Sequence, residues 1–346
     1  MTTKITDRPH LWIDLETFSS VPITYGVHRY CEASDAEVMV LSWAFGDEPV
    51  EVVDLTAGET PSPGFAKYVR DPSVLMLANN ASFDRNVLRL LSPDWWPSNG
   101  NNIKRWWCTM AWAALHSLPP QLGDMGKVLR IPEELRKLDE GKSLIHLFCK
   151  PLPKHRKLRR ATRETHPEEW ARFLRYAGND IEAMRACAKK LPTWNLTPHE
   201  VLTYHLDQRI NDRGVRLDVE LAEAAIKTSK AMKDGFDAQV LKLTDGEVVS
   251  AGQVQKILAF ALQTYGVSLP DLRADTLQRR LDDPDMPEPI RELLQARLTA
   301  SKTSATKFRA ARDSVCKDGR MHGLLRYCGA ERTARWSGQR VQPQNL

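Results

Sequence analysis

The sequence predicts an α/β domain followed by a mainly helical region. In the first half of the chain, short β-branched or apolar runs alternate with helical patterns, and Gly, Pro, Asp or Ser bounds each run. In the second half, apolar residues recur at helical spacing almost throughout. A chain of 346 residues is long enough for about two domains. We therefore expect a domain with a mixed or parallel sheet over residues 1–192 and a second region over residues 193–346.

Four runs in the first part have the composition of strands: HLWIDL (10–15), EVMVLSWAF (37–45), VEVVDL (50–55) and SVLMLA (73–78). A helical pattern follows the last of them at residues 83–91, and a longer one extends from Pro167 to about Lys190. Thr165 and Glu168 match a Thr-x-x-Glu capping box at the start of this long helix. Residues 191–198, LPTWNLTP, are predicted to be a linker.

The second part has four helical patterns, at residues 201–212, 219–234, 251–266 and 287–315. HGLLRYC, at residues 322–328, has the composition of a strand. The chain stops at VQPQNL without a helix end or a polar tail. We therefore expect a chain that is cut from a longer polypeptide.

Composition restricts the kind of protein. Apolar residues make up 42% of the chain and charged residues 27%, which is typical of folded, soluble proteins. No run approaches the roughly 20 apolar residues of a membrane span, and the first residues lack an apolar signal core, so we expect a cytoplasmic protein. The cysteines form no CxxC pair, which predicts neither a disulfide framework nor a thiolate zinc site.

Positive charge is concentrated in two segments. Residues 150–163 contain seven Lys or Arg among fourteen residues and no acidic residue. Residues 299–346 contain ten Lys or Arg against three Asp or Glu, a balance of +7, whereas the whole chain carries +5. Such clustering is typical of proteins that bind the phosphate backbone of nucleic acids. A solvated basic surface is the alternative.

Two carboxylates belong to the first predicted strand. Asp14 and Glu16 are two residues apart, so their side chains point to the same face of the strand. The apolar residues that alternate with them bury the opposite face. Because neighbouring carboxylates repel each other, a bound cation is the simplest way to keep both charged.

The long helix adds a second pair of candidate residues. Tyr176 and Asp180 are four residues apart and therefore lie on one face of the helix. Gly178 lies between them, and its missing side chain is expected to leave room for a substrate. The alternative is a Tyr at the edge of the core and a solvated Asp.

A fourth carboxylate follows the fourth predicted strand, where Asn80 and Asp84 flank Phe83. Turn and cap chemistry explains Asn and Asp at such a position. Together, however, Asp14, Glu16, Asp84 and Asp180 form an all-oxygen set suited to Mg²⁺ or Mn²⁺. Two such ions can stabilise the attacking and leaving oxygens of a phosphoryl displacement.

Three segments, read in order, resemble the exonuclease motifs of the DEDD 3′-to-5′ exonucleases: Asp14-Leu-Glu16-Thr17, Asn80-Ala-Ser-Phe83-Asp84 and Tyr176-Ala-Gly-Asn-Asp180. The match is to the Tyr-containing version found in family A DNA polymerases. The His-containing branch has a His five residues before the last Asp, and this chain has Arg175 there. The resemblance implies a ribonuclease H-like, mixed-sheet exonuclease domain.

The second part also resembles family A DNA polymerases, especially the phage type. Residues 207–218 and 298–308 are similar to the thumb and the early palm. ERTARWSGQRVQPQN, at residues 331–345, resembles the TGRxSS…NLQN segment, which contacts the primer-template minor groove. The match implies that five residues contact duplex DNA: Lys302, Arg335, Gln342, Gln344 and Asn345. Ala334 stands where the family has Gly, and Gln342 where it has Asn.

The resemblance implies a proofreading 3′-to-5′ exonuclease that acts in DNA replication. Its expected partners are a single-stranded 3′ end and primer-template duplex DNA, and its product is a nucleoside 5′-monophosphate. By family analogy, the four carboxylates hold two Mg²⁺ or Mn²⁺ ions and Tyr176 orients the attacking water. Thr17 and Asn80 are candidates for holding the terminal nucleotide. The family's polymerase carboxylates and fingers helix lie downstream, so we expect the chain to end before them.

Several alternatives remain open. The chain is a proofreading half whose palm and fingers belong to a separate polypeptide, an N-terminal fragment of a longer polymerase, or a catalytically inactive nuclease fold that binds DNA in a split polymerase. A stand-alone ribonuclease would leave the thumb-like part unexplained. A phage-type protein would work in the cytoplasm of its bacterial host.

Two short motifs are not expected to bind a ligand. GKS, at residues 141–143, lacks the earlier Gly of a P-loop, because Arg136 stands at that position. His146 and Cys149 lack the second pair of ligands that a zinc site requires.

Overall fold

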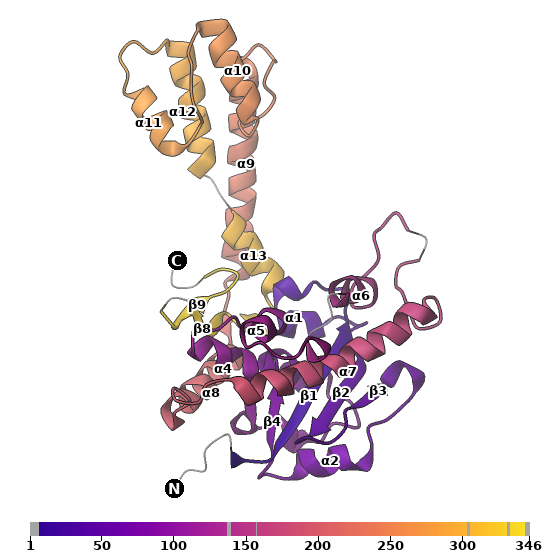
Figure 1. Ribbon diagram of the computed structural model, residues 1–346. Helices are drawn as coiled ribbons and strands as arrows, with labels where there is room; N and C mark the ends of the chain where they lie inside the picture. The colour runs from indigo at the N-terminus through magenta and orange to yellow at the C-terminus, as the bar shows by residue number, and fades with distance from the viewer. Residues whose placement is uncertain (1–6, 137–139, 157, 303–304, 331–332, 343–346) are drawn as a thin grey trace. The chain divides into compact units, whose positions relative to one another are not determined.

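A computed structural model describes residues 7–136, 140–156, 158–302, 305–330 and 333–342, with only the backbone of residues 301 and 302. The chain divides into two compact units (Figure 1). Unit 1 comprises Met1–Arg216 and Ser314–Leu346, and unit 2 comprises Leu217–Asp313. The α/β fold class expected for the first part is confirmed.

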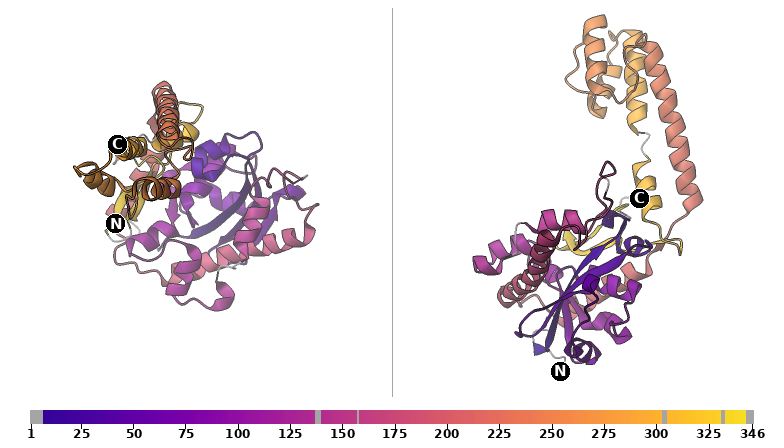
Figure 2. Two further views of the ribbon diagram at one scale, coloured as in Figure 1. Left: turned by 90° about the horizontal axis from the view of Figure 1, so that it is seen from above. Right: turned by 90° about the vertical axis from the view of Figure 1, so that its right-hand side faces the viewer.

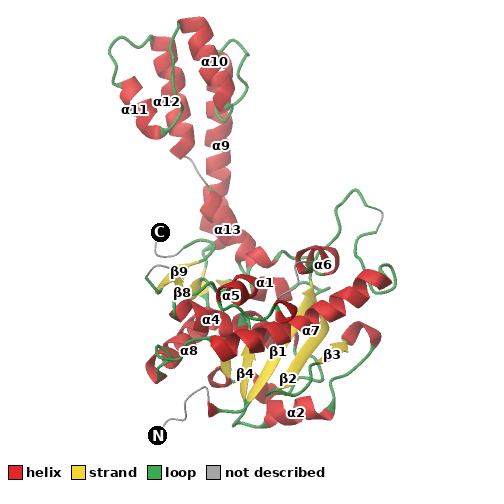
Figure 3. Ribbon diagram, viewed as in Figure 1, coloured by secondary structure: helices red, strands yellow, loops and turns green. Residues whose placement is uncertain are grey.

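Unit 1 is built on a five-stranded mixed sheet with the order β3-β2-β1-β4-β5, drawn in yellow in Figure 3. The strands are β1 (His10–Phe18), β2 (Glu37–Phe45), β3 (Glu51–Asp54), β4 (Leu75–Ala78) and β5 (Trp106–Cys108). β1 pairs antiparallel with β2 and parallel with β4. The first four strands lie where β-branched and apolar runs predict them, whereas the three residues of β5 are too few to give a periodic signal.

Several helices surround this sheet: α1 (Val27–Cys31), α2 (Pro63–Arg70), α3 (Ala81–Leu91), α4 (Thr109–Leu115), α5 (Leu122–Val128), α6 (Gly141–Phe148), α7 (Pro167–Lys190) and α8 (Pro198–Arg213). α7 packs across β1, β2 and β3, as Figure 1 shows. It buries an apolar stripe that includes Trp170, Phe173 and Ile181. The expected capping box is wrong, because the N-cap residue is His166 and makes no side-chain cap bond.

Unit 2 contains α9 (Val219–Leu243), α10 (Val254–Tyr265), α11 (Ala274–Leu281) and α12 (Glu288–Lys302). α9 is a long helix that packs beside α12 (Figure 2). Ile257, Leu277 and Leu293 are fully buried in the core of this unit. The single helix expected over residues 287–315 is instead two helices, α12 and α13 (Thr306–Ser314). Thr299 near the end of α12 and Thr306 at the start of α13 belong to a residue type that is less favourable in helix interiors.

The last segment of the described chain forms strands that belong to unit 1. These are β7 (Arg320–Met321), which pairs with β6 (Val215–Arg216), and β8 (Leu325–Ala330), which pairs with β9 (Arg335–Gly338). Asn211 of α8 ties β8 to this unit, because its side chain accepts from the Leu325 amide and donates to the Leu325 carbonyl. The compact units therefore differ from the division expected near residue 192. None of the helices in the described part of the chain is long and apolar enough to cross a membrane.

Candidate metal centre

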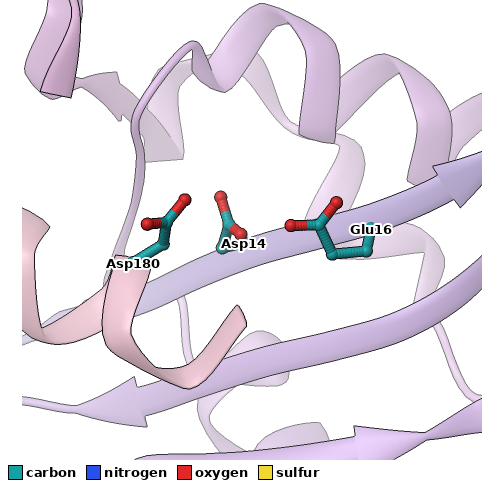
Figure 4. A group of neighbouring side chains, drawn as sticks. All are labelled: Asp14, Glu16 and Asp180. Atoms are coloured by element: carbon teal, nitrogen blue, oxygen red, sulfur yellow. The ribbon is translucent and has the colours of Figure 1, made fainter. Parts of the chain in front are cut away.

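Three carboxylates from distant parts of the sequence converge in unit 1. One oxygen each of Asp14, Glu16 and Asp180 lies within 4.8 Å of the others. Figure 4 shows Asp14 and Glu16 on one strand and Asp180 on the helix that faces it. Asp14 and Glu16 share a face of β1, as their spacing predicts, and α7 supplies Asp180 because it packs on that face. Glu16 and Asp180 are only 8% and 5% exposed, so their charges are poorly screened by water.

Asp84 belongs to the same surroundings. It lies in the first turn of α3 and is 2% exposed. Burial raises the pKa of Asp84 well above its ordinary value, and the nearby charge of Asp14 raises it further. A hydrogen bond from the backbone amide of Leu15 acts in the opposite direction. Asp84 therefore sits against β1, where a cation would offset the repulsion between its carboxylate and that of Asp14.

Tyr176 is buried next to the three carboxylates. Burial raises the pKa of its phenol, and the charges of Asp180, Glu16 and Asp14 raise it further, as does a side-chain hydrogen bond with Asp180. The phenol is therefore neutral and can donate a hydrogen bond at neutral pH. Gly178 does not open space for a substrate as expected, since a side chain there would meet Val52 of β3 at 3.0 Å.

Two residues beside this cluster have contacts that motif reading did not predict. The Cys149 thiol donates to Glu16 Oε2 at 3.7 Å. Burial raises the pKa of Cys149 well above its ordinary value, and the Glu16 charge adds to this effect. Gly141, at the start of α6, packs against the Tyr176 ring so closely that a Cβ there would lie 2.1 Å from a ring carbon. The spacing of the sequence gives no signal for either contact.

The two residues expected to hold a terminal nucleotide lie near the end of β1, where Thr17 is the next-to-last residue of the strand, and on the turn after β4, where Asn80 precedes α3. Thr17 is buried, and its hydroxyl shares a hydrogen bond of 2.8 Å with the Tyr30 hydroxyl. Asn80 is exposed and has a left-handed backbone with φ of 77°. It precedes α3 without making a side-chain cap bond, so capping does not explain it. Phe83 packs against the core and meets the Tyr30 ring edge-on.

The residues expected to contact duplex DNA are only partly described. Arg335 is exposed at the start of β9, and Gln342 is exposed four residues after that strand ends. Gln344 and Asn345 lie outside the described residues, as does the side chain of Lys302.

A cavity of about 600 Å³ lies beside the loop that carries Asn80. Asn80 and Phe83 line it on one side, and Tyr327 and Arg340 of the C-terminal segment line it on another. Asp207 of α8 also lines it and is 2% exposed. The cavity thus has walls of aromatic, amide and charged side chains, which suit a ligand with both flat and polar surfaces.

Some basic residues of the segment 150–163 form contacts within the fold, and others are exposed. Arg160 forms an ion pair with Glu37, and its guanidinium lies 3.9 Å from the centre of the Phe18 ring. Arg163 lies 3.8 Å from a carboxylate oxygen of Asp54. Lys154 and Arg156 are exposed. Part of the segment therefore supports the fold, and the exposed part is open to an anionic partner.

Comparison with known proteins places the chain. No protein-family model matches it. A DNA polymerase of Bacillus phage SP02 is 34% identical over 346 aligned positions, which cover 97% of this chain and 51% of the phage protein. The chain is a homologue of a phage DNA polymerase. The resemblance to DNA polymerases expected from the motifs is thereby confirmed, and the chain spans about half the length of this relative.

A solved structure shares the fold of this polymerase homologue. It is described as the POL domain of Pol1 from M. smegmatis in complex with DNA primer-template and dNTP. The TM-score is 0.57 with 16% identity, and the match covers 98% of this chain and 52% of that chain. A structure described as the apo form of the nuclease covers 57% of this chain and 77% of its own, but its TM-score of 0.33 is too low to indicate a shared fold.

Proposed function

We propose that this chain is the 3′-to-5′ exonuclease-bearing part of a family A DNA polymerase. The observation that carries the proposal is the convergence of Asp14, Glu16 and Asp180 within 4.8 Å. Asp84 is near enough to Asp14 for their charges to interact, and Tyr176 shares a hydrogen bond with Asp180, so both residues lie next to this cluster. The relationship to a phage DNA polymerase supports a substrate of DNA.

The donor set fits a hard divalent cation. The cluster offers carboxylate oxygens, and Mg²⁺ and Mn²⁺ prefer oxygen ligands in proteins. Burial raises the pKa of Asp84 and the neighbouring charge of Asp14 raises it further, so a cation between these two carboxylates would favour their ionised form. We propose that Asp14, Glu16, Asp84 and Asp180 hold two Mg²⁺ or Mn²⁺ ions. Such ions, when bound, supply positive charge for the attacking and leaving oxygens of phosphodiester hydrolysis.

The protein residues then have separate roles. Tyr176 keeps its proton, so its hydroxyl can orient the attacking water beside Asp180. Thr17, at the end of β1, and Asn80, just before α3, would position the terminal nucleotide. Hydrolysis at the last phosphodiester releases a nucleoside 5′-monophosphate and leaves a new 3′ hydroxyl on the strand.

The surroundings of the site support a path for DNA. The cavity lined by Asn80, Phe83 and Tyr327 can accept the bases of a single strand next to the terminal nucleotide. The exposed lysine and arginine residues at positions 150–163 would attract the phosphate backbone, so the activity should fall as salt is added. Arg335 and Gln342, which are exposed, would contact duplex DNA.

We further propose how the chain is organised. Unit 1 contains a ribonuclease H-like exonuclease domain, which its mixed sheet and the helix α7 across that sheet support. The helices of unit 2 correspond to a thumb, and β8 and β9 to the beginning of a palm. Polymerisation would require a further part, since the chain spans 51% of its phage relative.

The test is release of 5′-mononucleotides from 3′-labelled single-stranded DNA with Mg²⁺ or Mn²⁺. The parent chain is expected to release them, and Asp14→Ala and Asp180→Ala are expected to reduce the rate by more than about 10²-fold, since each removes a ligand of the cation and loss of even an outer partner costs up to about 100-fold. RNA of the same sequence serves as the second substrate, and faster release from RNA would contradict the DNA assignment. DNA binding without release would support the alternative, an inactive nuclease fold that acts as the DNA-binding subunit of a split polymerase.

A further inference from the structure

The short helix α6 touches the candidate site at both of its ends. It begins at Gly141 and is followed directly by Cys149, its C-cap residue. Gly141 lies against the ring of Tyr176, and Cys149 donates to Glu16. These are two of the five residues of the exonuclease motifs, and each is contacted by a different end of the same helix.

The contact at Gly141 depends on the absence of a side chain. A Cβ at this position would lie 2.1 Å from Tyr176 Cε2 and 2.7 Å from Cζ, and real Cβ atoms do not approach other atoms so closely. The helix and the ring cannot easily separate, because Leu144 and Phe148 of α6 are buried in the same cluster as Tyr176. Phe148 stacks on Phe173 with 5.1 Å between ring centres. A larger residue at position 141 would therefore displace the phenol from its place beside Asp180.

The contact at Cys149 concerns the orientation of a carboxylate. Glu16 has rotatable bonds that would let its carboxylate swing, and the thiol at 3.7 Å restricts the position of Oε2. Metal-binding carboxylates in proteins are commonly held by such outer hydrogen bonds, and loss of the partner weakens metal binding or activity. Cys149 is too far from the cluster of three to count as one of its members.

We propose that α6 is a positioning element of the exonuclease site, in which Gly141 fixes the Tyr176 ring and Cys149 fixes the Glu16 carboxylate. This inference rests on the proposed function. It explains two motifs to which the sequence assigns no ligand, the GKS tripeptide and the isolated cysteine of HLFC. Neither residue contacts the DNA, and each acts through a neighbour that does the chemistry.

The first test is Gly141→Ala, with Gly235→Ala as the matched control. A Cβ at Gly235, in the middle of α9, would meet nothing within 4 Å. Gly141→Ala is expected to lower kcat for mononucleotide release by roughly 10²-fold, the effect of misplacing a reacting group by about 1 Å. Its affinity for Mn²⁺, measured without DNA from the electron paramagnetic resonance of free Mn²⁺, is expected to fall much less than kcat, because Tyr176 is not a proposed ligand and reaches the metal site only through its hydrogen bond with Asp180.

The second test is Cys149→Ala and Cys149→Ser, with Cys187→Ala as the control for loss of a buried thiol. Cys187 lies on α7 in the other core cluster of unit 1. Cys149→Ala is expected to weaken Mn²⁺ binding roughly tenfold, the low end of the effect of removing an outer partner. Cys149→Ser keeps a donor and is expected to recover most of that loss. Cys187→Ala should leave the Mn²⁺ affinity as it is in the parent.

The outcomes separate the two proposals. If the parent chain neither binds Mn²⁺ nor releases nucleotides, the proposed function fails. If the parent does both, and the Gly141→Ala and Cys149→Ala proteins match it in kcat and Mn²⁺ affinity, the positioning role of α6 is overturned. A folded Gly141→Ala protein whose Mn²⁺ affinity falls as far as its kcat would also contradict the assignment, because the Gly141 end should act mainly on the orientation of the Tyr176 phenol and only indirectly on the metal ligand Asp180.

Discussion

Unit 1 and unit 2 differ in what they bury. Among the described residues, unit 1 buries charged side chains that include Glu16, Asp84, Arg85, Asp180 and Asp207. Among the described residues of unit 2, the only buried polar side chains are those of two threonines, Thr244 and Thr276. Thr244 satisfies its hydroxyl locally, by donating to the Val240 carbonyl and accepting from the Val248 amide.

This difference indicates where the chemistry of the chain lies. Burying a charge costs free energy unless it is paired, so proteins retain buried charges mainly where they serve a function or a specific contact. Unit 2 has an apolar core and places its charges at the surface, as a structural or binding module does. The carboxylates of unit 1 lie close together, where a bound cation would lower the free-energy cost of burying their charges.

The two units can also be observed separately. All ten tryptophans lie outside Leu217–Asp313, so tryptophan fluorescence reports the unfolding of unit 1 alone. Far-ultraviolet circular dichroism reports the helices of both units. Comparison of the two signals during urea unfolding therefore shows which unit a substitution destabilises.

The largest effect is expected from Asp212→Ala. Arg85, whose side chain is 1% exposed, forms two hydrogen bonds of 2.8 and 2.7 Å with the Asp212 carboxylate. Removing one partner leaves a buried, unpaired charge. The free energy of unfolding of unit 1, followed by tryptophan fluorescence, should therefore fall by about 3–5 kcal/mol. Lys189→Ala is the control, because its ion pair with Asp47 is 63% and 76% exposed and should contribute nothing measurable. Equal losses of stability from the two substitutions would show that the buried ion pair contributes no more than the exposed one.

Leu293→Ala should give a comparable but purely apolar effect in the other unit. Leu293 is fully buried in the core of unit 2. The lost contacts and the cavity left behind should cost about 2–5 kcal/mol. The dichroism signal of unit 2 should shift to lower urea concentration, while the tryptophan transition and nucleotide release stay unchanged. A tryptophan transition that moves equally would mean that the two units unfold together.

Asp207→Asn should change the pH dependence of unit 1. Burial raises the pKa of Asp207 to about 7, although Gln208 and Asn211 donate hydrogen bonds to it. Since its pKa is lower in the unfolded chain, the parent loses stability as the pH rises toward 7, by at most about 1.4 kcal/mol per pH unit. The variant does not lose stability in this way. The free energy of unfolding of the variant minus that of the parent should therefore be about 2 kcal/mol larger at pH 7 than at pH 5. A constant difference across this range would argue against a raised pKa.

The smallest effect is expected from Gly235→Ala. Gly235 lies inside α9, where an added Cβ would meet no atom within 4 Å. Alanine reduces the freedom of the unfolded chain and favours the helix, so unit 2 should gain about 0.5–1 kcal/mol. The dichroism transition should move to higher urea concentration and the tryptophan transition should not. Destabilisation would show that α9 has a neighbour at this position.

Local patterns predicted the regular parts of the fold well. The run EVMVLSWAF and the helix from Pro167 to Lys190 have the expected bounds, since long periodic segments carry a strong signal. β5 and α6 were not predicted, because segments of three to eight residues contain too few repeats of a strand or helix period. The two helices in place of one over residues 287–315 show that apolar spacing does not locate an internal helix end.

The sequence predicted that Asp14, Glu16 and Asp180 would come together, but not the contacts around them. Asp14 and Asp180 come from elements far apart in the chain, and only the family motifs linked them. Gly178 packs near Val52, and residue spacing within the helix does not predict this neighbour. The approach of Gly141 to Tyr176 likewise depends on how α6 folds back over α7.

Thermal unfolding with and without Mn²⁺ tests whether the clustered carboxylates of unit 1 form a divalent metal site. In the parent, Mn²⁺ at about 100 times its dissociation constant should stabilise unit 1 by about 2.7 kcal/mol, as read from tryptophan fluorescence. Asp180→Asn should lose most of this gain, and the transition of unit 2 should not respond in either protein. The absence of a shift in the parent, or an equal shift in Asp180→Asn, would contradict a divalent metal site at these carboxylates.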